Sequence, residues 1–141
     1  HHHVHLGAQG VRGRLVRNEA AALADREQVN VNFIEADIFN LDDEFNGKFD
    51  VVYEYTTYCA INPLRREKYA EKISSLIKKN GKLAAVLFPV DGREGGPPYN
   101  IDILEFYRYF SRHLKLELST RQINSIKPRR GNELLQIYIK K

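Results

Sequence analysis

The feature that most constrains the fold is a pair of short apolar runs with one clear helix signal between them. Residues 49–55 and 82–88 are nearly continuous apolar stretches, which is typical of strands inside a sheet that is covered on both faces. Between them, Asn62 suits the N-cap and Pro63 the first turn of a helix that we expect to end at Gly81. A strand, a helix and a second strand in this order predict two parallel neighbours in one sheet.

The C-terminal third of the chain predicts a different kind of strand pairing. Apolar residues at helical spacing predict an amphipathic helix from Ile103 to Phe110. Apolar and polar residues then alternate through 114–118 and 135–139, which predicts two half-buried strands with Leu135, Ile137 and Ile139 on the apolar side. We therefore expect an α/β fold whose sheet is parallel inside and closes with an antiparallel C-terminal strand pair.

The N-terminal quarter has weaker signals. Residues 1–17 contain three glycines and no clear period, so we expect an irregular segment there, and the histidines at its start resemble an expression tag. Residues 18–28 suit a helix capped by Asn18, and residues 29–36 suit a strand that leads into acidic residues. Residues 18–141 are accordingly predicted to form one domain.

Composition excludes several classes of protein. The 141 residues are 43% hydrophobic, which is enough for one domain with its own core. No apolar run reaches the ~20 residues that span a bilayer and the start lacks a signal-peptide pattern, so we expect a soluble cytoplasmic protein with no membrane partner. Cys59 is the single cysteine, which excludes an intrachain disulfide and a cysteine-rich zinc site, and we predict no bound metal.

A basic excess lies near the C-terminus. Residues 119–141 hold six lysines and arginines against one acid, within a net charge of +4. A solvated edge is the favoured interpretation, because stacking aromatics do not alternate with these charges. A surface for RNA or another anionic ligand, formed by Lys127, Arg129 and Arg130, is the alternative.

Ligands of open parallel sheets bind beyond the carboxyl ends of the strands. Three segments follow the predicted strands at that edge, residues 37–39, 54–61 and 89–99, and they combine acids, aromatic residues and a loop rich in glycine and proline. Carboxylates and aromatic faces stabilise a cation in a partly dry pocket. These segments are therefore the candidate binding site.

Each candidate residue also has a purely structural interpretation. Asp37 and Glu54 follow strands, where acids often start turns or cap helices. Tyr55 and Tyr58 could be core aromatics, and Cys59 suits a small buried hydrophobe better than a nucleophile. Taken one at a time, these residues do not decide between the two interpretations.

Several motifs in one order are more specific than any single motif. Along the chain they are Asp-Ile-Phe at 37–39, Phe-Asp at 49–50, Tyr-Glu-Tyr and Cys-Ala-Ile within 53–61, Phe-Pro at 88–89, Gly-Gly-Pro-Pro-Tyr at 95–99 and Gly-Asn-Glu-Leu at 131–134. From Phe33 onward, this series resembles the thiopurine and thiol/halide methyltransferase family of class I S-adenosylmethionine-dependent enzymes. The resemblance implies a Rossmann-like methyltransferase sheet.

The resemblance also implies a function and a set of site residues. The reaction would be one in-line methyl transfer from S-adenosylmethionine to a small soft nucleophile, such as a thiol, a halide or a thiopurine, with alignment supplying much of the rate. The implied cofactor-binding residues are Asp37, Ile38, Phe39, Glu54 and Tyr55. The implied acceptor pocket is formed by Tyr58, Pro98 and Tyr99, and the implied catalytic residues are Tyr55, Tyr58 and Tyr99.

A second methyltransferase signature is excluded. Pro97-Pro98-Tyr99 is similar to the Asn/Asp-Pro-Pro-Tyr motif of enzymes that methylate amino groups of bases or glutamine. Here Gly96 replaces the polar first residue, and the motif follows one strand later than that signature requires.

The family's N-terminal glycine loop cannot be placed in this sequence. Residues 7–13 have the wrong glycine spacing, so we expect an N-terminally truncated, partial methyltransferase domain over 18–141. The predicted strand at 31–36 would then lack its usual neighbours, and it must pair with 49–55, pair with a second chain, or fray. We therefore predict a homo-oligomer such as a dimer.

Three functions stay open at this level. The first is the methyltransferase itself, acting on a small-molecule acceptor. The second is a catalytically inactive, truncated methyltransferase-fold module that self-associates. The third is a binder of RNA or an anionic ligand through the basic C-terminal segment, which we consider the weakest of the three.

Overall fold

The computed structural model describes residues 3–6, 22–23, 25–28, 34 and 36–141. Its strands and longer helices are β1 (His3–Leu6), β2 (Phe49–Tyr55), α2 (Arg66–Leu76), β3 (Ile77–Leu87), α3 (Ile103–Phe110), β4 (Leu114–Thr120) and β5 (Leu134–Lys140). Short 3-10 helices lie at Ile38–Asn40, Asp43–Phe45, Tyr58–Ala60, Pro63–Arg65 and Lys127–Arg129. Much of the helix expected at 18–28 lies outside the described residues, although Ala22, Leu23, Asp25 and Arg26 are helical.

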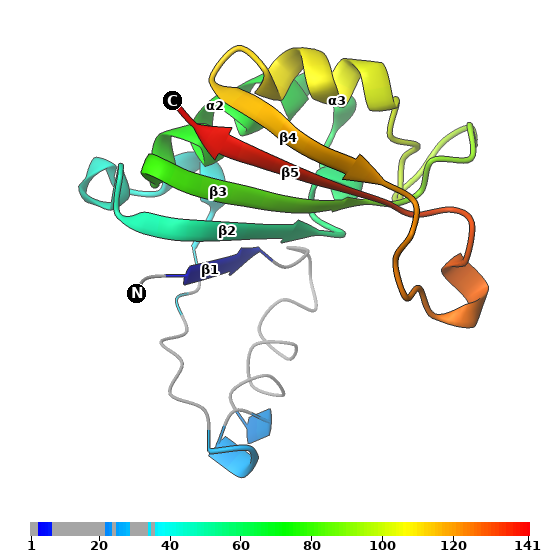
Figure 1. Cartoon of the computed structure of the whole chain (residues 1–141), viewed down its shortest axis with the longest axis horizontal. Coiled ribbons are helices and arrows are strands. Elements are labelled where there is room, and N and C mark those ends of the chain that lie inside the picture. Colours follow the sequence, from blue (N-terminus) through cyan, green and yellow to red (C-terminus); the bar gives the residue numbers. More distant parts are fainter. Residues whose placement is uncertain (1–2, 7–21, 24, 29–33, 35) are drawn as a thin grey trace.

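The strands form one sheet in the order β1-β2-β3-β5-β4 (Figure 1). β2 and β3 are parallel neighbours, with Val51 opposite Lys82 and Tyr55 opposite Val86. β5 runs antiparallel to both β3 and β4. The predicted α/β sheet, parallel inside with an antiparallel C-terminal pair, is therefore confirmed.

The neighbour of β2 differs from the expected one. β1 pairs in parallel with β2, with His3 opposite Val51 and Leu6 opposite Glu54, so a strand lies where the sequence predicted an irregular segment. Most of the strand expected at 29–36 lies outside the described residues. Because β1 and β3 flank β2, the edge of β2 with which a strand at 31–36 could pair is occupied by β1. The homo-oligomer stays a prediction.

Helix α2 ends earlier than the sequence predicted. Asn62 caps the 3-10 helix at Pro63–Arg65 that leads into α2, and its side chain accepts a hydrogen bond from the Leu64 amide. α2 itself begins at Arg66. The helix then stops at Leu76, because Ile77 is extended (φ −81°, ψ 130°), buried and paired with Phe49 of β2. Gly81 therefore belongs to β3 rather than to the end of the helix.

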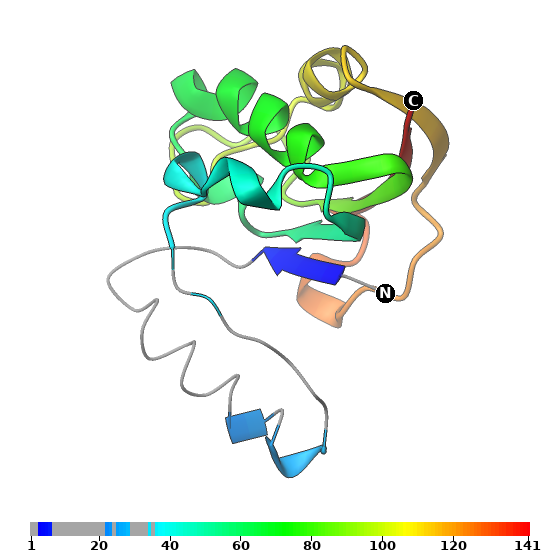
Figure 2. The same ribbon diagram turned by 90° about the vertical axis from the view of Figure 1, so that its left-hand side faces the viewer.

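Helices α2 and α3 cover the same face of the sheet, as Figures 1 and 2 show from two directions. Leu83, Ala85 and Leu87 of β3 are buried on this inner face, together with Tyr138 of β5. They form one apolar cluster with α2 and α3, whose contributing residues are Tyr69, Ile73, Leu76, Phe106 and Phe110. Alternate strand residues thus face the helices, as the pleat of a strand requires.

The opposite, outer face corrects two predictions. Within the described residues it is only half-buried, and Tyr53 is 43% exposed, so β2 is not covered on both faces. In β5 the buried side consists of Leu134, Gln136 and Tyr138, while Leu135, Ile137 and Ile139 are half-buried on the outer face. Gln136 tolerates burial because its amide accepts from the Tyr138 hydroxyl (2.6 Å) and donates to Ser119 Oγ (3.3 Å). None of the described helices is long and apolar enough to cross a membrane.

Candidate functional site

The parallel direction of β2 and β3 brings their carboxyl ends to one edge of the sheet. The turn after β2 and the loop after β3 meet there, since the Tyr99 amide donates to the Cys59 carbonyl at 2.7 Å. The segment before β5 reaches the same edge, where the Val90 amide donates to Asn132 Oδ1 at 2.8 Å. Two of the three segments singled out in the sequence are therefore together, and residues 127–133 join them.

Tyr55, the last residue of β2, is held by charged side chains from the segment before β5. Its hydroxyl donates to the carboxylate of buried Glu133 and accepts a hydrogen bond from Arg129 at 2.6 Å. The Arg129 guanidinium also lies over the Phe88 ring, 4.3 Å from its centre. Partial burial, followed by the bond to Glu133, raises the pKa of Tyr55. The phenol is therefore neutral near pH 7 and fixed in position.

Glu54 points in the opposite direction, into the core. Its carboxylate accepts hydrogen bonds from the Tyr58 amide and from the Tyr69 hydroxyl (3.2 Å), and its side chain is 1% exposed. Burial raises the pKa of Glu54 to about 7, against the lowering effect of these hydrogen bonds and of Arg66. In this position the carboxyl group organises the turn after β2.

Tyr58 and Cys59 are also internal. The Tyr58 side chain is fully buried, with its ring 4.9 Å from that of Phe106 and 6.0 Å from that of Tyr69. Tyr58 is therefore placed as a core aromatic, which is the structural interpretation that the sequence left open for it. Cys59 carries a buried free thiol, and burial raises the pKa of this thiol to about 11. The prediction that Cys59 is a small buried hydrophobe is therefore confirmed.

The 37–39 segment has mainly local contacts. Exposed Asp37 caps the first 3-10 helix, and it accepts from the Phe39 amide at 3.0 Å and from Asn40 Nδ2 at 3.3 Å. Ile38 is buried in the core, and the Arg65 guanidinium lies 3.7 Å from the centre of the Phe39 ring. The Arg65 contact fastens the segment to the 3-10 helix that precedes α2, whereas Tyr55 and Tyr99 have their contacts at the sheet edge.

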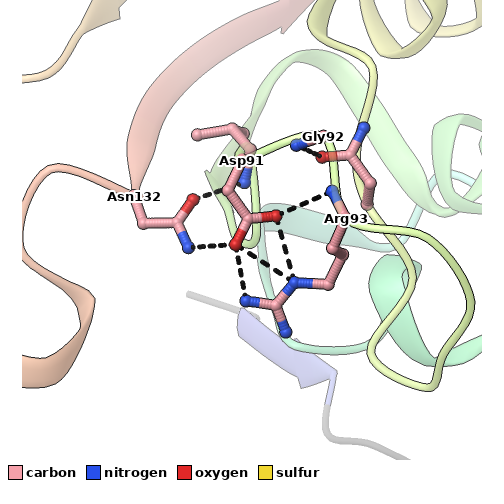
Figure 3. A network of polar contacts seen from close by, with 6 residues as sticks. Asp91, Gly92, Arg93 and Asn132 are labelled. Atoms are coloured by element: carbon pink, nitrogen blue, oxygen red, sulfur yellow. Dashed lines mark hydrogen bonds and ion pairs between the residues drawn. The ribbon is translucent and has the colours of Figure 1, made fainter.

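The loop at residues 89–100 is braced by the network in Figure 3. Asp91 accepts from Arg93 at 2.7 Å and from Asn132 Nδ2 at 3.0 Å, and Arg93 holds the pKa of Asp91 well below its usual range. Across the loop, the Gly92 amide donates to Asn100 Oδ1 at 2.8 Å. The half-buried Pro98 and Tyr99 thus lie in a loop with defined anchors.

Two residues of this edge were not among the predicted site residues. In the sequence, Arg129 belongs to the basic C-terminal segment and Glu133 to the Gly-Asn-Glu-Leu motif. Their contacts with Tyr55 span 74 and 78 residues of sequence, so no local pattern predicts them. Among the described residues, no group of three His, Cys, Asp or Glu side chains is arranged to hold a metal ion.

Comparisons of the sequence and of the structure with known proteins both find methyltransferases. The sequence model of the family described as thiopurine S-methyltransferase (TPMT) matches residues 12–137. Over 75 residues the chain is 37% identical to the probable thiol methyltransferase 2 of Arabidopsis thaliana, covering 53% of this chain and 32% of that protein. Over 74 residues it is 36% identical to the thiopurine S-methyltransferase of Mus musculus, covering 52% and 31%. The matched part is thus about a third of the length of these relatives.

Solved structures share the fold at low sequence identity. A Burkholderia thailandensis 1,6-didemethyltoxoflavin-N1-methyltransferase with bound S-adenosylhomocysteine superposes with a TM-score of 0.68 and 20% identity, covering 98% of this chain and 71% of that one. The N-methyltransferase NodS from Bradyrhizobium japonicum superposes with a TM-score of 0.71 and 10% identity, covering 99% and 85%. These likenesses show a Rossmann-like methyltransferase fold. With a family match over residues 12–137, the chain belongs to the thiopurine S-methyltransferase family.

Proposed function

We propose that this protein takes part in S-adenosylmethionine-dependent methyl transfer to a small soft nucleophile, namely a thiol, a halide or a thiopurine. The observation that carries the proposal is the family match over residues 12–137. The convergence of Tyr55 and the Tyr99 loop at the carboxyl edge of the parallel strands supports it, because this is where ligands of such sheets bind.

The chemistry of the described residues fits the cofactor. Asp37 is exposed and its carboxylate accepts two local hydrogen bonds, which leaves acceptor capacity for the exocyclic amine of an adenine. Ile38 and Phe39 would provide apolar contact beside it, and Tyr55 would lie beside the methionine part. When bound, S-adenosylmethionine supplies a methyl group activated by its sulfonium charge.

The acceptor side would be formed by Tyr55, Pro98 and Tyr99. Because the side chains of Glu54 and Tyr58 are buried, we assign them an indirect part, through the shape of the turn that presents Tyr55. The Tyr55 hydroxyl is already engaged by Arg129 and Glu133, so it is a poor general base. An acceptor that is already nucleophilic, aligned by these rings, needs no such base.

Calorimetric titration of the full chain with S-adenosylhomocysteine tests the proposal. We expect micromolar binding by the wild type and at least a tenfold rise in Kd for Asp37→Ala, about 1.4 kcal/mol. Asp42→Ala is the matched control, because Asp42 also caps a short 3-10 helix through its side chain. A folded wild-type chain that binds no S-adenosylhomocysteine would contradict the proposal. If the chain binds S-adenosylhomocysteine, a screen of thiols, iodide and thiopurines would identify the acceptor.

A self-associating module is the second candidate, and the outer face of the sheet supports it. A groove there is lined by Leu118, Ile137 and Ile139 together with Lys82, Lys115, Leu116 and Glu117. Apolar residues with both signs of charge suit a self-complementary two-fold contact. Sedimentation at increasing concentration should then show a dimer that Ile137→Lys abolishes, while Leu104→Lys on α3 leaves it intact. A monomeric wild type would exclude this function.

A further inference from the structure

Tyr99 is held through its backbone from two sides. Its amide donates to the Cys59 carbonyl at 2.7 Å, which ties it to the turn after β2. Its own carbonyl accepts a long contact, 3.5 Å, from a guanidinium nitrogen of Arg66, and the next carbonyl, that of Asn100, accepts from the same guanidinium at 3.0 Å. The backbone on both sides of the Tyr99 ring is therefore fixed to other elements.

Arg66, the first residue of α2, is buried. Its side chain is 3% exposed, although arginine is rarely buried without partners. Besides the Tyr99 and Asn100 carbonyls, it donates through Nε to the Tyr58 carbonyl at 3.3 Å and lies over the Tyr58 ring, 4.4 Å from its centre. Glu105 of α3 lies 3.9 Å away and supplies the compensating charge.

These partners come from separate segments of the chain. One planar guanidinium joins the turn after β2 to the end of the 89–100 loop, because its donors diverge in a fixed fork. A lysine ammonium is a compact charge without that fork, so it cannot reproduce the same set of contacts. The contacts at this junction therefore require the planar guanidinium of Arg66 and not only its positive charge.

The Tyr99 ring is also confined by the loop itself. A Cβ atom built on Gly96 would lie 2.6 Å from Tyr99 Cδ1 and 2.7 Å from the Tyr99 amide nitrogen. Such distances are too short for any side chain, so the ring rests directly on the Gly96 backbone. Gly96 and Arg66 therefore constrain Tyr99 from independent directions.

We propose that Arg66 is a positioning residue that fixes Tyr99 at the wall of the acceptor pocket. The pocket part of this inference rests on the proposed function. Arg66 contacts no ligand in this assignment, and it acts only through the placement of residues 99–100. Its loss should therefore affect the acceptor and leave the cofactor site at Asp37 unchanged.

Amide hydrogen exchange tests the structural part without any activity. In Arg66→Lys we expect protection of the Tyr99 amide to fall at least about tenfold, while the amides of the β3–β5 ladder keep their protection. Arg108→Lys, an exposed arginine of α3, is the matched control and should change neither. Unchanged protection at Tyr99 would overturn the proposal. Loss of protection throughout the chain would also overturn it, because Arg66 would then support the fold in general.

Kinetics test the pocket part. We expect Arg66→Lys and Gly96→Ala each to raise the acceptor KM about tenfold, with the Kd for S-adenosylhomocysteine within about twofold of wild type. An unchanged acceptor KM in an active Arg66→Lys enzyme would refute the positioning role. A wild type without S-adenosylhomocysteine affinity would instead refute the proposed function and with it the pocket assignment, and the exchange data alone would decide whether Arg66 holds Tyr99.

Discussion

The buried carboxyl group of Glu54 makes stability depend on pH in a direction that is opposite to that of most acids. Burial raises the pKa of Glu54 from its ordinary 4.5 to about 7. Between these values the folded chain binds more protons than the unfolded chain, so the free energy of unfolding falls as pH rises. At about 1.4 kcal/mol per unit of pH, this group alone should lower the free energy of unfolding by about 3 kcal/mol between pH 4.5 and 7.

Glu54→Gln isolates this contribution. The amide oxygen can still accept from the Tyr58 amide, and the Tyr69 hydroxyl can turn to accept from the new NH₂ group. The variant should therefore lose the pH-dependent cost and equal or exceed the wild type in stability above pH 7. As pH is lowered to 4.5, the wild type should gain about 3 kcal/mol of stability relative to the variant.

Urea denaturation followed by far-ultraviolet circular dichroism, repeated from pH 4.5 to 8.5, measures this difference. Glu71→Gln is the control, because Glu71 lies on α2 with an exposed side chain. Its profile should parallel that of the wild type throughout. If the Glu54→Gln and wild-type profiles are also parallel, then the ionisation of Glu54 is not coupled to folding and the reasoning fails.

Three further predictions concern the core and the single thiol. Phe106→Ala should lower the free energy of unfolding in urea by about 3–5 kcal/mol, because the fully buried Phe106 ring contacts three other aromatic rings. Leu104 lies on the same helix and is 74% exposed, so Leu104→Ala should stay within about 0.5 kcal/mol of the wild type. Gly81→Ala should lower stability by about 1–3 kcal/mol, since its Cβ would lie 2.7 Å from Ile77 Cγ2; an unchanged urea midpoint would contradict this. Cys59, with a pKa of about 11, should react with a disulfide reagent at pH 8 much more slowly in the native chain than in urea. Equal rates would show that the thiol is accessible.

The sequence predicted the elements whose signals are local. The apolar run at 49–55 became β2, helical spacing after Asp102 became α3, and Asn62 caps the turn that leads into α2. The structure and the comparisons also confirmed the fold class and the family, which rest on local signals and on the order of motifs. Periodicity and caps depend on neighbours a few residues away, and a series of motifs retains its order in the chain.

The tertiary structure decided which partner each polar side chain meets. Glu54 and Tyr55 are adjacent in sequence, yet the pleat of β2 sends one carboxylate into the core and one phenol to Arg129 and Glu133. Arg66 donates to the Asn100 carbonyl across 34 residues of sequence, and no pattern near Arg66 in the sequence predicts that contact. Local spacing determines which residues share a face, but burial, charge compensation and hydrogen-bond partners depend on segments that only folding brings together.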